Sequence, residues 1–317
     1  MTKKKWTKDD MPSLSNKTAI VTGANSGLGF EVTKGLAAKE AHVILACRNI
    51  EKGEAAAKSI YESYTNSSLK VMHLDLADLS SVRAFVKTFK NENHSLDILC
   101  NNAGIMFPPY IKTVDNFELQ FGVNYLGHFA LTGLLLDLLL QTEGARVVSM
   151  SSITHTFGKI DFENLNWEKP KSYRLVASYG RSKLANLMFA YELQRKLENK
   201  GAKVISVASH PGYAATPGQT TGLKMNKSIS SKMILLFIKL LTITFAQSAE
   251  MGALPMLYAA TCPDIKGGEY IGPTRVMNMR GYPKKVRSNK ESYDLDVAKR
   301  LWEISEELTG VRYESLN

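Results

Sequence analysis

The stretch KTAIVTGANSGLG, from Lys17 to Gly29, constrains the fold more than any other part of this sequence. Its first half is short and apolar, which predicts a buried strand, and apolar side chains recur with helical spacing after the last glycine. Gly23, Gly27 and Gly29 let the backbone pass close to a bound group, because no side chain is in the way. A helix that begins near Gly27 offers free N–H groups and the positive end of its dipole to an anion such as pyrophosphate. The stretch therefore predicts a strand–turn–helix unit with an anion-binding turn.

Short apolar segments and amphipathic helical segments alternate after this unit. The predicted strands are Thr18–Thr22, His42–Ala46, Leu69–Leu74, Asp97–Asn101, Arg146–Ser151 and Lys203–Ser209. The predicted helices are Gly27–Lys39, Ile50–Ser63, Ser80–Asn91, Asn116–Leu140 and Ser178–Lys200. Such alternation predicts an α/β fold, a doubly wound parallel sheet with helices on both faces. Ligands of these sheets bind beyond the carboxyl ends of the strands, and the polar motifs described below fall at such ends.

Length and composition favour one domain. With 317 residues, of which 44% are hydrophobic, the chain can bury a large core, and no linker rich in Pro, Gly or Ser divides it. We expect an exposed N-terminal arm over residues 1–16 and a single domain over residues 17–317. The further segments expected in that domain are a substrate loop at about 212–245 and a C-terminal extension at about 269–317, which contains a strand over Glu269–Gly272 and a helix over Asp294–Leu308.

An apolar run over residues 233–245 is the strongest candidate for contact with a membrane. It has 13 residues and contains Lys239, whereas a membrane span needs about 20 apolar residues. The run therefore predicts a lid over an apolar pocket or a segment that touches a membrane surface, and no transmembrane segment. The basic start of the chain has no apolar stretch behind it, so it is not typical of a secretory signal.

Cysteine spacing and charge exclude several kinds of function. Cys47, Cys100 and Cys262 form no C-x-x-C pair and the His residues show no metal-ligand spacing, so we expect no disulfide framework, no metal site and a reducing, cytoplasmic location. The net charge of +10 comes from dispersed Lys and Arg residues without a nucleic-acid motif. We therefore expect no nucleic-acid partner, and a basic surface that helps to attract an anionic cofactor.

A Tyr and a Lys lie four residues apart in the segment Y-G-R-S-K, from Tyr179 to Lys183. Helical spacing puts both side chains on one face, so that the ammonium group can lie beside the phenol. A nearby positive charge lowers the pKa of a phenol and brings its proton transfer closer to neutral pH. The pair therefore indicates acid–base chemistry at Tyr179, although a solvent-exposed helical Tyr can have the same spacing by accident.

Together these motifs resemble the short-chain dehydrogenase/reductase family, over nearly the whole chain from about Lys17 to Tyr313. The matching motifs, in the order of the family, are T-G-A-N-S-G-L-G at 22–29, D-L at 75–76, N-N-A-G at 101–104, N-Y at 124–125, S-S at 151–152, Y-G-R-S-K at 179–183 and H-P-G at 210–212. The glycine spacing is T-G-x-x-x-G-x-G rather than the G-x-G-x-x-G of the dinucleotide fingerprint. The resemblance implies a Rossmann fold and hydride transfer between a nicotinamide cofactor and a carbonyl or alcohol group.

The resemblance assigns the catalytic group to Asn124, Ser152, Tyr179 and Lys183. Tyr179 would exchange a proton with the reacting oxygen, and Lys183 would lower the pKa of Tyr179 and hold the nicotinamide ribose. Ser152 would hydrogen-bond the reacting oxygen, and Asn124 would position a water molecule that links Lys183 to solvent. Apart from the resemblance, Asn124 is equally a helix-kink residue, and Ser151 or Ser152 equally the end of a strand.

Most of the motifs contribute to the predicted cofactor site. Its expected residues are Gly23, Asn25, Ser26, Gly27, Leu28, Gly29, Arg48, Asp75, Leu76, Asn102, Ala103, Gly104, Tyr179, Lys183, Pro211, Gly212 and Thr216. The resemblance places Asp75 at the adenine and residues 102–104 at the ribose. Asp75 or Asp78 can also cap the next helix, and Asn101 can tie strands together.

The end of the second predicted strand favours NADP over NAD. An acidic residue at this turn would bind the ribose 2′-hydroxyl of NAD, but the sequence has Cys47 followed by Arg48. A guanidinium group binds the 2′-phosphate of NADP well, because the charges are opposite and the geometry is bidentate. We therefore expect NADP(H) as the cofactor, with an exposed loop arginine as the alternative.

Ser152 and Tyr179 are 27 residues apart, more than in compact members of the family. The segment between them, residues 155–176, contains several aromatic residues and predicts a lid or a pocket wall. This arrangement is similar to the branch that includes retinol dehydrogenases, WW-domain oxidoreductases and light-dependent protochlorophyllide reductases. We expect an NADP-dependent oxidoreductase for a hydrophobic carbonyl or alcohol substrate. The alternatives are an NADPH-binding regulator without turnover and a C=C reductase of a conjugated ring, and a homo-oligomer is expected by analogy alone.

Overall fold

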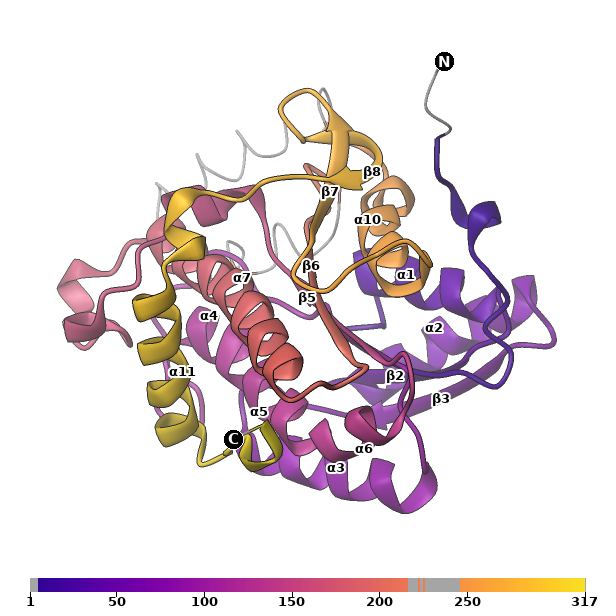
Figure 1. Ribbon diagram of the computed structural model, residues 1–317, viewed down its shortest axis with the longest axis horizontal. Coiled ribbons are helices and arrows are strands. Elements are labelled where there is room, and N and C mark those ends of the chain that lie inside the picture. The colour runs from indigo at the N-terminus through magenta and orange to yellow at the C-terminus, as the bar shows by residue number, and fades with distance from the viewer. Residues whose placement is uncertain (1–4, 216–221, 223–224, 226–245, 317) are drawn as a thin grey trace.

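The computed structural model describes residues 5–215, 222, 225 and 246–316. In this part of the chain, eight strands form one sheet in the order β3-β2-β1-β4-β5-β6-β7-β8 (Figure 1). The strands are β1 (Thr18–Thr22), β2 (His42–Cys47), β3 (Ser68–His73), β4 (Ile98–Asn101), β5 (Arg146–Met150), β6 (Ile205–Ser209), β7 (Tyr270–Arg275) and β8 (Arg280–Lys285). All neighbouring strands are parallel except β7 and β8. The expected doubly wound α/β fold is thereby confirmed.

Helices cover both faces of the sheet. They are α1 (Gly27–Ala37), α2 (Ile50–Ser63), α3 (Leu79–Glu92), α4 (Leu119–Phe121), α5 (Gly127–Leu134), α6 (Leu136–Gln141), α7 (Leu175–Asn199), α10 (Ala249–Thr261) and α11 (Leu295–Thr309). Helices α1, α2 and α10 pack on one face, and α3, α5, α7 and α11 on the other (Figure 1). Each face of the sheet has its own hydrophobic core, and successive strand residues point into the two cores alternately. Val21 and Leu45 pack in the core under α1, α2 and α10, and Ile20 and Ile44 in the core on the opposite face. Burial on both sides explains why these strands are short and apolar.

The single helix expected over residues 116–140 is divided in the structure. Its pieces are α4, a π-helical turn η2 (Gly122–Leu126), α5 and α6. A π-helical turn inserts one residue more per turn than an α-helix, so it shifts the side chains that follow it around the helix axis. Asn124 lies in this turn, and the position of its side chain therefore depends on a local irregularity that apolar spacing does not reveal.

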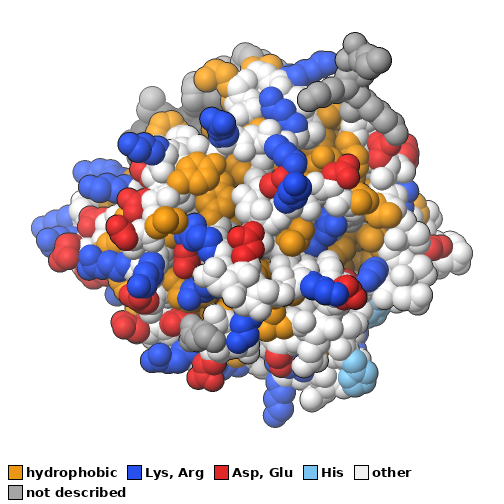
Figure 2. Space-filling view, viewed as in Figure 1, with side chains coloured by type: hydrophobic (Ala, Val, Ile, Leu, Met, Phe, Trp, Pro, Cys, Tyr) orange, Lys and Arg blue, Asp and Glu red, His pale blue; other side chains and the backbone are white. Residues whose placement is uncertain are grey.

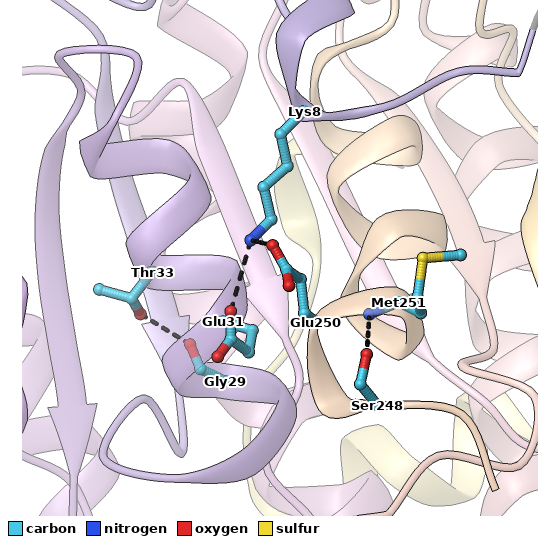
Figure 3. Close-up of polar contacts among 7 residues, drawn as sticks. All are labelled: Lys8, Gly29, Glu31, Thr33, Ser248, Glu250 and Met251. Carbon is cyan, nitrogen blue, oxygen red and sulfur yellow. Dashed lines mark hydrogen bonds and ion pairs between the residues drawn. The ribbon is translucent and has the colours of Figure 1, made fainter.

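The N-terminal arm, expected to be exposed, packs on the body of the protein through some side chains of residues 5–16, while others are exposed. Met11 and Leu14 are buried, and the ring of Trp6 contacts that of Tyr258 edge to face at 5.1 Å between centroids. The 3-10 turn η1 (Lys8–Asp10) carries Lys8 across the two helices α1 and α10. Its Nζ lies 3.4 Å from a carboxylate oxygen of Glu31 and 3.0 Å from one of Glu250, as Figure 3 shows.

Two expected segments fall outside the described residues, namely Thr216 and the apolar run over 233–245. Within the described ranges, no helix combines the length and the apolar character that crossing a bilayer requires. On the face seen in Figure 2, basic side chains are interspersed with acidic ones and do not gather into one patch.

Candidate active site

A cleft of about 840 Å³ opens where β1, β2, β3 and β4 end. Its wall includes most of the predicted cofactor residues, which are Gly23, Asn25, Ser26, Gly27, Leu28, Gly29, Arg48, Asp75, Leu76, Asn102, Ala103 and Gly104. Four other predicted residues, Tyr179, Lys183, Pro211 and Gly212, do not line this cleft. The predicted nucleotide-binding motifs therefore meet at one place, at the carboxyl edge of the sheet that parallel topology dictates.

The glycine turn has the shape of an anion cradle. Gly23 and Gly27 have φ angles of +66° and +55°, in the left-handed region that favours glycine. A Cβ atom on Gly29 would lie 2.2 Å from the carbonyl oxygen of Gly23, so the turn closes only when no side chain is present. The hydroxyl of Thr33 donates to the carbonyl of Gly29 at 2.8 Å and secures the first turn of α1 (Figure 3). A pyrophosphate fits this site because the first N–H groups of α1 open into the cleft.

Thr22 joins the glycine turn to the segment N-N-A-G that follows β4. Its hydroxyl oxygen accepts hydrogen bonds from the backbone N–H groups of Asn102 and Ala103, both at 2.9 Å. The side-chain amide of Asn102 donates to the carbonyl of Thr22 at 2.8 Å. Asn101 instead ties β4 to α5, because its amide donates to the hydroxyl of Thr132 at 2.9 Å. These bonds hold the segment that leads to Gly104 against the glycine turn, and Gly104 lines the cleft.

Two basic side chains line the cleft beyond β2. Arg48 was predicted there, and Lys52, in the first turn of α2, was missed. Both are exposed, and Asn49 between them caps α2 by accepting a hydrogen bond from the N–H of Lys52 at 2.7 Å. Lys52 lies four residues after Arg48, at the start of a helix, and this spacing could have predicted that both side chains face the cleft.

The two aspartates after β3 have separate roles. Asp78 is the N-cap of α3, and its carboxylate accepts a hydrogen bond from the N–H of Ser80 at 2.8 Å. Asp75 lines the cleft and accepts a hydrogen bond from the N–H of Ala77 at 2.9 Å. Asp75 can therefore contact a ligand in the cleft, whereas Asp78 caps helix α3.

Asn124 is fully buried and holds the loop after Gly104. Its side-chain oxygen accepts from the N–H of Ile105 at 2.8 Å, and its side-chain nitrogen donates to the carbonyl of Ile105 and to the hydroxyl of Ser182, both at 3.0 Å. A Cβ atom on Gly104 would lie 3.2 Å from Oδ1 of Asn124 and 3.4 Å from Nζ of Lys183. The predicted catalytic Asn and Lys therefore meet at Gly104, which lines the cleft.

Tyr179 and Lys183 lie on the same face of α7, as their spacing predicts. Nζ of Lys183 is 5.6 Å from the centroid of the Tyr179 ring and donates to the carbonyl of Met150 at 3.1 Å. Ser152 caps the turn η3 (Ile153–Phe157), and its side chain interacts with the phenol hydroxyl of Tyr179. Ser151 is directed elsewhere, because its hydroxyl donates to the carbonyl of Lys183 at 2.9 Å. The geometry thus brings Ser152, Tyr179 and Lys183 together and sets Ser151 apart.

Burial shifts the pKa values of these groups in opposite directions. It raises the pKa of Tyr179 to about 12, an increase that the hydrogen bond with Ser152 opposes, and it lowers the pKa of Lys183 to about 8. The expectation of a lowered pKa for Tyr179 is not met in this structure. The ammonium group of Lys183 donates to a backbone carbonyl. Desolvation of the phenol is the main cause of the raised pKa of Tyr179.

Phe107 lies at the candidate site although no motif in the sequence indicated it. Its ring meets the Tyr179 ring edge to face, with centroids 5.5 Å apart, and its φ angle is +61°, which is unfavourable for a residue with a side chain. The side-chain oxygen of buried Gln120 accepts from the N–H of Phe107 at 2.9 Å, and the Gln120 amide donates to Tyr173 at 2.9 Å. Tyr173 in turn donates to the buried carboxylate of Glu118 at 3.1 Å. Strain of this kind persists where the surroundings enforce it, and it is frequent at functional sites.

The segment between Ser152 and Tyr179 packs on α7. Arg181 donates from Nε to the carbonyl of Lys159 at 3.0 Å and from Nη1 to the carbonyls of Asn164 and Leu165 at 2.6 and 2.8 Å. Its guanidinium carbon lies 4.5 Å from the Trp167 ring centroid. These contacts make the segment a wall that is anchored next to the predicted catalytic helix.

The segment H-P-G lies beside the β7–β8 hairpin. Gly212 has a φ angle of +66°, and a Cβ atom on it would lie 2.3 Å from the carbonyl oxygen of Met279. Buried Gln247 donates to the carbonyl of Pro211 at 2.7 Å and accepts from the N–H of Gly281 at 2.9 Å. Pro211 and Gly212 are therefore held in place by elements near the C-terminus, whose involvement the sequence did not predict.

Comparison with known proteins decides the family. The profile of the short chain dehydrogenases matches residues 17–165. Human (Homo sapiens) retinol dehydrogenase 13 is 40% identical over 307 residues, which cover 96% of this chain and 88% of the relative. The chain belongs to the short-chain dehydrogenase family. Mouse (Mus musculus) retinol dehydrogenase 12 is 39% identical over 303 residues, which cover 95% of this chain and 89% of the relative.

A crystal structure of another protein shows the same fold. A protein from Mycobacterium paratuberculosis superimposes with a TM-score of 0.80 at 39% identity, over 98% of this chain and 99% of that one. The similarity to retinol dehydrogenases over nearly the full length confirms the branch that the motifs suggested. This short-chain dehydrogenase is accordingly an NAD(P)-dependent oxidoreductase of alcohol or carbonyl groups, and the cleft is the site that fits the nicotinamide cofactor.

Proposed function

We propose that this short-chain dehydrogenase uses NADP(H) to interconvert a hydrophobic carbonyl compound and its alcohol, with Tyr179 as the acid–base group. The observation that carries the proposal is the meeting of the cleft with the predicted catalytic side chains at Gly104. A Cβ atom on Gly104 would lie 3.2 Å from Oδ1 of Asn124 and 3.4 Å from Nζ of Lys183, and Nζ lies 5.6 Å from the Tyr179 ring centroid.

The preference for NADP(H) rests on charge. Arg48 and Lys52 line the cleft beyond β2, where an NAD-dependent enzyme would have a carboxylate for the ribose hydroxyl. Two exposed cations at this turn favour an additional phosphate group, and the guanidinium can bind it with two hydrogen bonds. The bound cofactor would supply the hydride.

The side chains around the reacting carbonyl would supply the proton for its oxygen and stabilise the charge that develops there. The raised pKa of Tyr179 keeps its phenol protonated at neutral pH, which is the form that donates to a carbonyl oxygen during reduction. The Ser152 hydroxyl, beside that phenol, would hydrogen-bond the same oxygen as negative charge develops on it. Lys183 would contribute its positive charge and its N–H donors, and Asn124 would hold the loop that borders the site.

A hydrophobic substrate fits the apolar surface near Tyr179. Phe107 packs directly against the Tyr179 ring, and Ile105, Leu119 and Val123 add apolar surface in the cleft. Apolar walls around a few polar groups are typical of sites that bind small hydrophobic molecules.

The test is turnover, measured as oxidation of NADPH in the presence of a panel of apolar aldehydes and ketones. We expect the wild-type protein to oxidise NADPH with at least one of them. Tyr179→Phe should bind NADPH as the wild type does and lose turnover about 100-fold or more, because the ring remains and the proton donor is gone. Normal turnover in this variant would refute the assignment of Tyr179.

The same experiment separates the alternatives. Tight NADPH binding without turnover on any carbonyl, and without a change in Tyr179→Phe, would indicate a regulator that senses the cofactor. Reduction of a conjugated C=C bond with the carbonyl left intact would indicate the second alternative. A cytoplasmic location and a homo-oligomer stay predictions.

A further inference from the structure

The buried imidazole of His128 has no part in the proposed chemistry, yet it lies between the two halves of the site. The side chain is 2% exposed and extends from the first turn of α5. Its Nε2 is 2.9 Å from the hydroxyl oxygen of Thr22, and its Nδ1 is 3.0 Å from the backbone carbonyl oxygen of Asn124. Thr22 precedes the glycine turn and Asn124 lies in the π-helical turn, so one ring spans the distance between them.

Hydrogen-bond accounting determines the tautomer of this ring. The carbonyl of Asn124 can only accept, so Nδ1 of His128 carries a proton and donates it. In a neutral ring Nε2 then has a lone pair, and the Thr22 hydroxyl donates to it. The lone pairs of the Thr22 hydroxyl remain free to accept the N–H groups of Asn102 and Ala103, which both lie at 2.9 Å. The carbonyl of Cys100 is a second, more distant acceptor for the Thr22 hydroxyl, at 3.3 Å compared with 2.9 Å for Nε2.

The neutral form of the ring is favoured by its surroundings. Burial is the main cause that lowers the pKa of His128 to about 4; the hydrogen bond to the backbone carbonyl of Asn124 opposes this shift, and the positive charge of Lys183 adds to it. Near neutral pH the ring therefore keeps a single proton, and the tautomer with that proton on Nδ1 is the one that satisfies both neighbours.

The two residues that His128 contacts, Thr22 and Asn124, hold the backbone on the two sides of Gly104. At one end the Thr22 hydroxyl holds the N–H groups of Asn102 and Ala103, which line the cleft. At the other end Asn124 holds both backbone groups of Ile105. The imidazole joins these two contacts, so a displacement of the ring would move the segment 102–105 relative to the catalytic side chains.

We propose that His128 is a positioning residue that couples the cofactor-binding turn at 102–104 to the catalytic turn at Asn124 through its two ring nitrogens. The expected effect on turnover rests on the proposed function, whereas the coupling of Thr22 to Asn124 does not. The proposal assigns a different duty to each nitrogen, Nε2 to the cofactor side and Nδ1 to the catalytic side.

Three substitutions separate these duties. His128→Gln puts an amide oxygen near the place of Nε2 and can still accept from Thr22, whereas His128→Asn puts an amide nitrogen near the place of Nδ1 and can still donate to Asn124. His128→Phe keeps the planar shape and removes both bonds. His94→Phe, at an exposed histidine, is the matched control. The measurements are the Kd for NADPH by fluorescence titration, kcat and KM with a reducible carbonyl, and the Tm.

We expect His128→Phe to weaken NADPH binding about tenfold and to lower kcat at least tenfold, which corresponds to the loss of one or two buried hydrogen bonds. His128→Gln should keep the Kd for NADPH within about threefold of the wild type and lose kcat, and His128→Asn should show the opposite split. His94→Phe should match the wild type in all measurements.

Two results of these measurements would overturn the proposal. One is a lower Tm in all three variants with unchanged Kd and kcat, which would show a purely structural histidine. Another is an identical pattern in His128→Gln and His128→Asn. If the wild type turns over no carbonyl, the proposed function fails and the Kd for NADPH still decides. If NADPH does not bind either, a double-mutant cycle of Thr22→Val and His128→Phe in urea unfolding decides, because additive effects would refute the link and coupled effects would support it.

Discussion

At the scale of single residues, the active-site Tyr and Lys are governed by desolvation. Tyr179 and Lys183 are adjacent, but burial raises the pKa of the phenol to about 12 and lowers that of the ammonium to about 8. Both groups are therefore protonated at neutral pH, one neutral and one charged. Raising the pH above about 8 removes the charge of Lys183 before it affects the phenol. The buried cation thus costs stability that the fold must supply elsewhere.

This cost predicts how stability depends on pH. The pKa of Lys183 falls from 10.5 when unfolded to about 8 when folded, so between these values the unfolded chain binds more protons and stability rises with pH. Lys183→Met should remove up to about 3 kcal/mol of this rise between pH 7 and pH 10. Urea unfolding at both pH values measures it, with exposed Lys58→Met as control. An equal pH dependence in Lys183→Met and the wild type would contradict the argument.

Arg48 and Lys52 carry a second prediction at this scale. Replacing either by Ala should raise the KM for NADPH about tenfold and leave that for NADH within about twofold, because only NADPH has the 2′-phosphate. The double variant should lose most of the preference. Lys58→Ala, farther along α2, is the control. Equal effects on the two cofactors would remove the assignment of both cations.

At the scale of elements, local patterns predicted the strands and the helices with a polar and an apolar side. Helix α10 was missed because it is buried over most of its surface and contains Pro255, so it shows neither amphipathic spacing nor an uninterrupted helical composition. Strand β8 was missed because its sequence RGYPKK is polar and contains Gly281 and Pro283. The π-helical turn at Asn124 was missed because the apolar spacing of the segment does not distinguish a π-helical turn from an α-helical one.

The contact between η3 and α7 determines where Ser152 lies relative to Tyr179. A Cβ atom on Gly158 would lie 2.4 Å from the carbonyl oxygen of Gly180, and one on Gly180 would lie 2.7 Å from that of Thr154. The two backbones touch directly, because neither glycine has a side chain. The long segment between Ser152 and Tyr179 is therefore compatible with a close approach of the two residues.

Gly180→Ala tests this contact. The added methyl group should push η3 away from α7, lower the free energy of unfolding by about 1 to 3 kcal/mol and reduce kcat more than tenfold. The Kd for NADPH should change little, since neither glycine lines the cleft. Val176→Ala, at an exposed position of the same helix, is the control. A variant with normal kcat would show that this contact does not position Ser152.

At the scale of the whole molecule, the N-terminal arm bridges two helices that are far apart in the sequence. Lys8 pairs with Glu31 of α1 and Glu250 of α10, and Trp6 packs on Tyr258 (Figure 3). The ion pairs are partly exposed to solvent, so their contribution to stability is small and sensitive to salt. The aromatic contact does not depend on charge.

Two variants distinguish these contributions. Lys8→Ala should lower the free energy of unfolding by less than about 1 kcal/mol in low salt and by even less in 1 M NaCl. Trp6→Ala should cost about 1 to 2 kcal/mol at both salt concentrations. Urea unfolding at two salt concentrations measures both effects. An arm without influence on stability would leave both variants unchanged.

The sequence by itself determined the alternation of strands and helices, the glycine turn and the family, because these depend on spacing along a short stretch of chain. The predicted cofactor residues came together in one cleft because the carboxyl ends of parallel strands meet at one edge. Only the tertiary structure decided the raised pKa of Tyr179, the strained backbone of Phe107 and the link through His128. Burial, strain and hydrogen-bond partners of this kind arise between segments that are distant in the chain, so local spacing contains no record of them.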